Sequence, residues 1–155
     1  MSDVLTPISL VVYLRSLHLR SRTGILLLHQ SHLGKEEAIA VQLGIEALNY
    51  SALLLESLPE KTDYVTITSV TEEARLFEIA QRRSGMEVVL IYNFDLVLSK
   101  LTLDERSRLW ENLRERFAKS AKALLFAVPA AATHLLPQGA EWHLWEEGNR
   151  IVGMN

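Results

Sequence analysis

Three short and almost wholly apolar runs constrain the fold of this chain more than any other feature. They are Gly24–Leu28, Glu87–Ile91 and Ala123–Val128. Each run is brief and is followed by a polar or proline-containing turn, which is typical of strands buried on both faces of a parallel sheet. Segments with helical spacing of apolar residues lie between the runs. This alternation predicts a three-layer α/β domain with a mainly parallel central sheet.

Helical spacing predicts long helices over Lys35–Leu48 and over Leu103 to about Lys122. Near the C-terminus, Trp142–Trp145 and Arg150–Met154 flank the residues Glu-Glu-Gly-Asn, a pattern that predicts a C-terminal β-hairpin. No repeat or linker interrupts the chain, so residues 1–155 are predicted to form a single domain.

The loops that follow the three predicted strands are the expected place for a ligand. In parallel sheets, ligands bind beyond the carboxyl ends of the strands. We therefore expect His29–Lys35, Tyr92–Asp95 and the turn after Val128 to lie together at one rim of the sheet.

Composition excludes several classes of protein. The net charge of −3 gives the chain as a whole no electrostatic signature of a nucleic-acid-binding protein. Cysteine is absent, which excludes disulfides and thiolate catalysis and fits a reducing compartment. The apolar runs are far below the roughly 18 residues that a membrane span requires, and the N-terminal stretch lacks the basic region of a secretory signal. We expect a cytoplasmic protein with no membrane partner.

The loop after the first predicted strand keeps part of a phosphate-binding motif. Residues 29–36 read His-Gln-Ser-His-Leu-Gly-Lys-Glu, where a P-loop would read G-x-x-x-x-G-K-[ST]. In that motif backbone N–H groups surround the phosphates, the lysine neutralises charge and the hydroxyl holds magnesium. Gly34 and Lys35 are kept and are the candidate nucleotide-binding residues, whereas His29 and Glu36 replace the first glycine and the hydroxyl residue. The alternative, which these eight residues alone favour, is an ordinary helix start where Glu36 suits the helix dipole.

The stretch after the second predicted strand, Tyr92-Asn-Phe-Asp95, lies where a magnesium-binding carboxylate would be needed for nucleotide hydrolysis. Tyr92 stands at the magnesium position and cannot bind the ion. Asp95 is the only acid nearby; it could orient a water molecule, or it could cap a helix over Leu96–Lys100, and we favour the cap. After the third strand, Pro129–Ala132 offers no polar group to sense a γ-phosphate. The three positions together argue against efficient hydrolysis.

Taken together, these residues resemble the BrxF family, the small P-loop proteins of BREX phage-defence systems. The resemblance covers most of the chain from about Arg22 onward. It rests on three stretches, Gly24–Leu48, Leu48–Pro59 and Val88–Asp95. In that family the last stretch is similar to an Asp-Asn-x-Glu magnesium motif, which Asn93 and Asp95 match and Tyr92 does not.

The chain is also similar to RecA- and KaiC-like domains, in which an arginine-rich helix follows a strand. The resemblance implies a P-loop NTPase-like, RecA-like fold. Some relatives of that superfamily, such as the division inhibitor SulA and Elongator subunits, have lost nucleotide chemistry and serve as interaction modules. The departures at His29, Glu36 and Tyr92 favour the same outcome for this chain.

The helix predicted over Leu103–Lys122 is rich in charge. It carries the basic residues Arg106, Arg108, Arg114, Arg116, Lys119 and Lys122 and the acids Asp104, Glu105, Glu111 and Glu115. One interpretation is a strip that faces a protein partner or DNA, or an arginine finger for a neighbouring subunit's nucleotide, with Arg106, Arg114 and Arg116 as candidates. The other, which we favour, is a solvated face with ion pairs along the helix.

The tryptophans of the predicted hairpin and one pair of histidines complete the candidate residues. On a strand Trp142 and Trp145 would face opposite sides, so one is expected in the core and the other exposed. Trp145 is the candidate contact with a protein partner, and packing under the terminal loop is the alternative. His29 and His32 lie three apart without a third ligand nearby, so no metal site is predicted.

Three hypotheses of function follow, in order of preference. The first is a non-catalytic P-loop-like protein without a cofactor, acting as an interaction subunit of a larger bacterial assembly, such as a phage-defence system, or as a homo-oligomer. The second is a weak ATP- and magnesium-binding subunit whose site a neighbouring subunit completes. The third, which is not favoured, is a DNA-binding accessory module that uses the Leu103–Lys122 helix.

Overall fold

The central element of the computed structural model, which describes residues 5–16, 21–56, 67–117 and 120–154, is one parallel sheet. Its five strands are β1 (Thr23–Leu28), β2 (Glu46–Asn49), β3 (Val88–Tyr92), β4 (Ala123–Pro129) and β5 (Ile151–Met154). They lie in the order β2-β3-β4-β1-β5, and every neighbouring pair is parallel. The three apolar runs are β1, β3 and β4, so the predicted α/β class and parallel sheet are confirmed.

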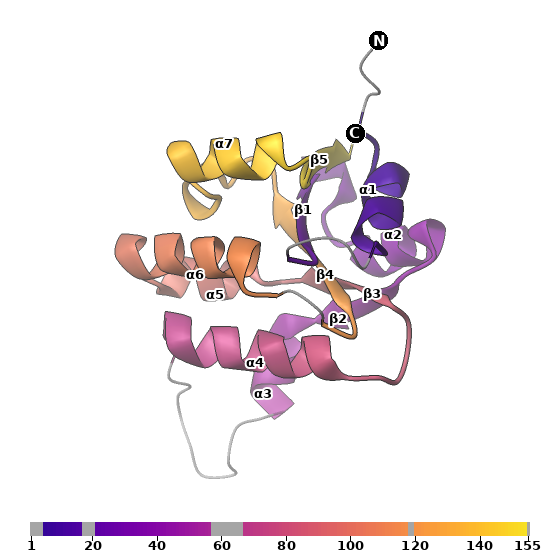
Figure 1. Cartoon of the computed structure of the whole chain (residues 1–155), viewed down its shortest axis with the longest axis horizontal. Coiled ribbons are helices and arrows are strands. Elements are labelled where there is room, and N and C mark those ends of the chain that lie inside the picture. Colours follow the sequence, from indigo (N-terminus) through magenta and orange to yellow (C-terminus); the bar gives the residue numbers. More distant parts are fainter. Residues whose placement is uncertain (1–4, 17–20, 57–66, 118–119, 155) are drawn as a thin grey trace.

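Helices cover both faces of the sheet and complete three layers (Figure 1). One face carries α1 (Pro7–Leu14) and α2 (Glu36–Leu43). The other face carries α3 (Tyr50–Glu56), α4 (Ser69–Gln81), α5 (Asp95–Lys100), α6 (Leu103–Glu115) and α7 (Ala140–Glu147). None of the helices in the described ranges is long and apolar enough to cross a membrane.

Alternating side chains of the strands divide the core in two. On β1, Ile25 faces the α3–α7 side, whereas Leu26 and Leu28 face α1 and α2. The α3–α7 side holds the larger core, in which Trp110 of α6 and Trp145 of α7 are wholly buried. Period-two alternation in a sheet covered on both faces explains why β1, β3 and β4 are apolar throughout.

The prediction of a C-terminal β-hairpin is wrong. Trp142–Trp145 lies inside α7, and β5 pairs in parallel with β1 instead of antiparallel with a neighbour in sequence. The Gly-Asn pair that suggests a hairpin turn ends the helix: Gly148 is the C-cap, and Asn149 has the left-handed φ of 56°. Glycine and asparagine serve both kinds of turn, so the pair alone does not separate them.

Two of the predicted helices are shorter in the structure. The helix predicted over Lys35–Leu48 ends at Leu43, because Gly44 adopts a left-handed φ of 71° and the chain turns into β2. The helix predicted to reach Lys122 ends at Glu115. The Lys122 ammonium is buried, where it donates to the Met86 carbonyl (2.6 Å) and to Glu46 (3.1 Å), so it anchors the start of β4 and not a helix.

Candidate functional site

The loops after β1, β3 and β4 meet at the carboxyl rim of the sheet, as predicted. β4 lies between β1 and β3, so the ends of all three strands are adjacent. A cavity of about 200 Å³ opens there. It is lined by Leu28, Leu33, Gly34, Glu36, Asn93, Asp95, Ala127 and Pro129. The rim therefore brings together two of the three candidate nucleotide-binding residues, Gly34 and Asp95, and Lys35 is not in the lining.

The loop between β1 and α2 is closed by its own hydrogen bonds. A 3₁₀ turn occupies Gln30–His32. The five consecutive backbone N–H groups from Ser31 to Lys35 all have acceptors inside the segment. Two acceptors are side chains: Ser31 donates to His29 Nδ1 (3.2 Å) and Gly34 to Glu36 Oε1 (3.1 Å). Three are carbonyls: His32 donates to His29 (2.9 Å), Leu33 to Gln30 (3.3 Å) and Lys35 to His32 (3.1 Å). A phosphate cradle needs such groups to be free, because they are the donors that surround the anion.

The side chains of Glu36 and His29, the two residues that break the motif, accept two of the five hydrogen bonds that close the loop. The Glu36 carboxylate is buried and accepts the Gly34 N–H, which puts a fixed negative charge where a phosphate oxygen would be held. Gly34 has a φ of 85°, so the left-handed backbone of the motif's glycine is retained. Lys35 is exposed at the N-cap of α2, and its side-chain ammonium makes no hydrogen bond or ion pair with any residue of the described ranges.

The end of β3 provides no magnesium ligand. The Tyr92 hydroxyl donates to Glu37 Oε1 (3.0 Å) of α2. Burial, followed by the neighbouring Glu37 carboxylate, raises the pKa of Tyr92. Asn93, at a φ of 59°, directs its side-chain amide to Asn49 Oδ1 (3.1 Å) at the end of β2. Both side chains are thus engaged with neighbouring elements of the fold.

Asp95 is the first residue of α5, whose N-cap is Phe94, so the prediction that Asp95 caps this helix is wrong. The Asp95 side chain is half-buried in the cavity wall and has no hydrogen-bond or ion-pair partner within the described part of the chain. An acid in the first turn of a helix is favourable to its dipole. β4 itself contributes the apolar Ala127 and its last residue, Pro129, to the lining.

The rim residues do not fit a magnesium–triphosphate group. The backbone donors of the loop are used internally, a carboxylate faces the cavity from Glu36, and Tyr92 replaces the magnesium ligand. The cavity of about 200 Å³ is also smaller than the 300–1,000 Å³ that is usual for small-molecule sites. Among the described residues, no three His, Asp or Glu side chains are grouped so that they could hold a metal ion.

Two of the three arginines proposed to face a partner are engaged within the fold. Arg106 donates to the carbonyls of Leu98 (3.0 Å), Leu101 (3.1 Å) and His134 (3.0 Å). Arg114 binds Glu141 of α7 through two bonds of 2.6 and 3.3 Å, and this contact raises its pKa. Arg116 is 68 % exposed, and its side chain has no partner in the described ranges other than Glu73 at 3.9 Å, so of the three it is the one that can bind outside the chain.

The prediction of Trp145 as an exposed contact residue is wrong. Its indole is wholly buried, with the ring centroid 5.8 Å from that of Trp110 and the Arg150 guanidinium 4.5 Å from the ring. The error follows from the hairpin prediction, because in a helix this position faces the core. Trp142 is half-buried and lines a second cavity, of about 300 Å³, beside Leu136 and Pro137.

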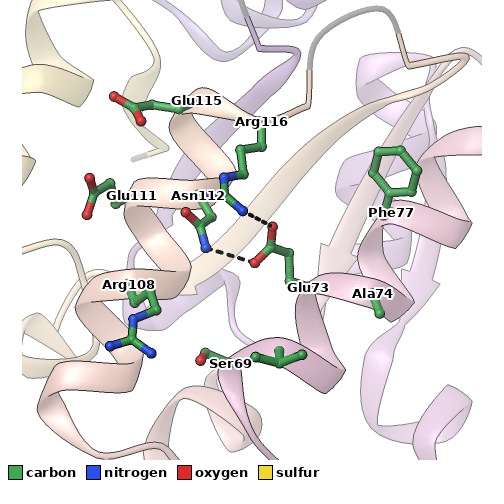
Figure 2. Close-up of a pocket in the computed structure, with 10 residues that line it drawn as sticks. Ser69, Glu73, Ala74, Phe77, Arg108, Glu111, Asn112, Glu115 and Arg116 are labelled. Atoms are coloured by element: carbon green, nitrogen blue, oxygen red, sulfur yellow. Dashed lines mark hydrogen bonds and ion pairs between the residues drawn. The ribbon is translucent and has the colours of Figure 1, made fainter.

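A groove between two helices was not predicted from the sequence. It is a groove of about 700 Å³ between α4 and α6, shown in Figure 2. Asn112 and Arg116 reach across from α6 to Glu73 on α4, with Asn112 donating a 2.8 Å hydrogen bond. The sequence signal that could have indicated it is Val70, Ala74 and Phe77, an i, i+4, i+7 apolar series on α4 beside its core-facing series.

No protein-family model matches the chain, and no curated protein or solved structure is significantly similar to it.

Proposed function

We propose that this chain is a degenerate, RecA-like P-loop domain that neither binds nor hydrolyses nucleotide and acts as an interaction subunit of a bacterial multi-protein assembly. The observation that carries the proposal is the closed loop: the five N–H groups from Ser31 to Lys35 all have internal acceptors, one of which is the Glu36 carboxylate. Opening the loop for a phosphate would break those bonds and move a negative charge out of a buried position.

The topology around the loop supports the RecA-like part of the proposal. A buried strand, a loop and a helix follow one another over β1 and α2, and β4 separates β1 from β3. The positions that would carry nucleotide chemistry thus share one rim, yet each lacks the group that this chemistry needs. Glu36 and Tyr92 stand in place of magnesium ligands, and β4 ends at the apolar Pro129. Phage defence, the setting of the proteins that the sequence resembles, is the assembly that we propose. Phage-defence genes adjacent to the coding sequence would support it, and an unrelated neighbourhood would count against it.

The proposal predicts that ATP with magnesium will leave the melting temperature unchanged. A ligand at 100-fold over its Kd stabilises a native protein by about 2.7 kcal/mol, which is roughly 5–10 °C for a domain of this size. Thermal unfolding of the wild-type chain with ATP–Mg, with magnesium alone and with sulfate measures this directly, and Lys35→Ala is the matched variant. An ATP-dependent rise in melting temperature that disappears in Lys35→Ala would reject the proposal.

That rejecting result would support the second candidate, a weak ATP-binding subunit completed by a neighbour. The specific observation in its favour is that Gly34 and Asp95 share one cavity while Lys35 stays free beside it. The DNA-binding alternative has less support. With Arg106 and Arg114 engaged in the fold, the exposed basic residues of α6 and its C-cap in the described ranges are Arg108 and Arg116, beside the exposed acid Glu111.

A further inference from the structure

The α4–α6 face is a hollowed surface with one apolar wall and one charged wall. It consists of Ser69, Val70, Glu73, Ala74 and Phe77 from α4 and Arg108, Glu111, Asn112, Glu115 and Arg116 from α6. The two helices pack side by side, and the groove of about 700 Å³ follows their solvent side (Figure 2). This is large enough to receive part of another helix.

The α4 wall exposes apolar side chains that the fold covers only in part; the Phe77 ring, for example, also makes an edge-to-face contact with Phe117 (5.8 Å between centroids). Val70 is 70 % exposed and Phe77 is 46 % exposed, and Ala74 lies between them on the same stripe. The core-facing stripe of α4 is separate and consists of Leu76, Ile79 and Ala80. A helix with a second apolar stripe facing water is typical of a contact surface, because exposed apolar area is unfavourable unless a partner covers it.

The α6 wall carries opposite charges, those of Arg108 and Glu111, that the described part of the chain does not pair. Arg108 and Glu111 lie one turn apart and are both exposed, yet neither has a hydrogen-bond or ion-pair partner among the residues that the structure describes. Figure 2 shows the Arg108 guanidinium turned away from the Glu111 carboxylate. The charges of the whole face are nearly balanced, with Arg108 and Arg116 against Glu73, Glu111 and Glu115.

From this pattern we infer that the α4–α6 face is the interface between two copies of this chain. In a two-fold dimer, contacts are reciprocal: a residue that meets a second residue on the partner is met by it in return. Arg108 of one copy can then pair with Glu111 of the other, and the same pair forms again across the axis. Arg108 and Glu111 are separated by about one helical turn of 5.4 Å, a distance that an arginine side chain can span. The pair can therefore form whether the two α6 helices run parallel or antiparallel.

A second copy fits this face better than a partner of a single charge. A wholly acidic partner would satisfy Arg108 and repel Glu111, and a wholly basic one would do the reverse. The same contact covers the stripe of Val70, Ala74 and Phe77 on both copies. The α4–α6 face shares no lining residue with the rim cavity. This inference therefore goes beyond the proposed function and does not depend on whether the Glu36 carboxylate closes the rim loop.

Sedimentation velocity over a concentration series tests the inference. The wild-type chain is expected to sediment as a dimer, and Arg108→Glu and Glu111→Arg are each expected to raise the dimer Kd at least about tenfold, because each places like charges opposite one another twice. Val41→Glu on α2, where Val41 is 81 % exposed on the opposite side of the sheet, is the control and should leave the Kd unchanged.

Two further samples separate a reciprocal contact from a general loss of stability. An equimolar mixture of Arg108→Glu and Glu111→Arg should form a heterodimer, because one variant presents two acids and the other two bases. The double variant R108E/E111R should recover the homodimer. A wild-type chain that stays monomeric at millimolar concentration would overturn the inference and leave the face to a partner of different sequence. A dimer that is insensitive to both charge reversals would also overturn it. Neither result would change the nucleotide experiment.

Discussion

Replacing Trp110 with alanine is expected to lower the free energy of unfolding by about 3–5 kcal/mol. Trp110 of α6 is wholly buried against the sheet. Its ring makes edge-to-face contacts with Phe126 of β4 (5.9 Å between centroids) and with Trp145 of α7 (5.8 Å). The indole N–H also donates to the Leu135 carbonyl (2.9 Å), in the turn that follows β4. Alanine would leave a cavity among three elements and an unpaired carbonyl.

Urea unfolding followed by circular dichroism measures this loss without depending on the fluorescence of the residue removed. Trp110→Phe keeps an aromatic ring and loses only part of the volume and the N–H bond, so a clearly smaller loss is expected. Val41→Ala on the exposed face of α2 should change the free energy of unfolding by no more than about 0.5 kcal/mol. A loss below about 1 kcal/mol for Trp110→Ala would mean that this aromatic cluster does not hold α6 and α7 on the sheet.

The strands that could be predicted are those whose burial is complete. β1, β3 and β4 are apolar because both of their faces are covered. A continuous apolar run can be recognised as a buried strand without knowing which strand it pairs with. β2 is an edge strand whose residues Glu46–Asn49 are only half-buried, so its sequence contains no such run. Its residues continue the helical spacing of the segment before it, and the helix predicted over Lys35–Leu48 therefore includes most of β2. The position of β5 beside β1 depends on a long-range pairing that four residues cannot specify.

The location of the rim could be predicted from the sequence, whereas the closure of its loop between β1 and α2 could not. Strand order brings Gly34 and Asp95 to one cavity, which the motif positions and the rule for parallel sheets already indicated. The closure of the loop depends on its 3₁₀ turn and on where the Glu36 carboxylate and the His29 ring point. The sequence shows that these residues depart from the motif, but a departure alone does not say whether the loop is merely weakened or filled by its own side chain.

The buried Glu72 of α4 leads to the second large expected effect. Its carboxylate accepts hydrogen bonds from the Tyr50 hydroxyl (2.9 Å) and from Thr71 Oγ1 (3.1 Å), and it pairs with Arg75 (2.8 Å). Tyr50 directly follows β2, and its ring packs edge-to-face on Phe94 with centroids 5.0 Å apart. The network therefore fixes α4 to the part of the rim next to Asp95. Tyr50→Phe is expected to lower the free energy of unfolding by about 1–3 kcal/mol at pH 7, because Glu72 stays buried with one donor fewer.

Tyr50 should also give this stability a characteristic dependence on alkaline pH. Burial is the main cause that raises the pKa of Tyr50 far above its usual value of 10.0, and the Glu72 charge adds to it. The folded state therefore retains a proton that the unfolded state releases above about pH 10. The contribution is fully present below that pH and is lost as the pH rises, at about 1.4 kcal/mol per pH unit for this one group.

The difference between the wild-type chain and Tyr50→Phe isolates that contribution from every other group that titrates in alkali. Urea unfolding between pH 8 and pH 11 should give two curves that converge above about pH 10, because phenylalanine has no proton to retain. Tyr13→Phe, on the exposed side of α1, removes a phenol without touching Glu72 and should run parallel to the wild type. Parallel curves for Tyr50→Phe would mean that the hydroxyl ionises as readily in the folded as in the unfolded state, and hence that it is not held by a buried carboxylate. Since the same hydroxyl joins α4 to the end of β2, that outcome would also remove the reason for regarding this side of the rim as rigid.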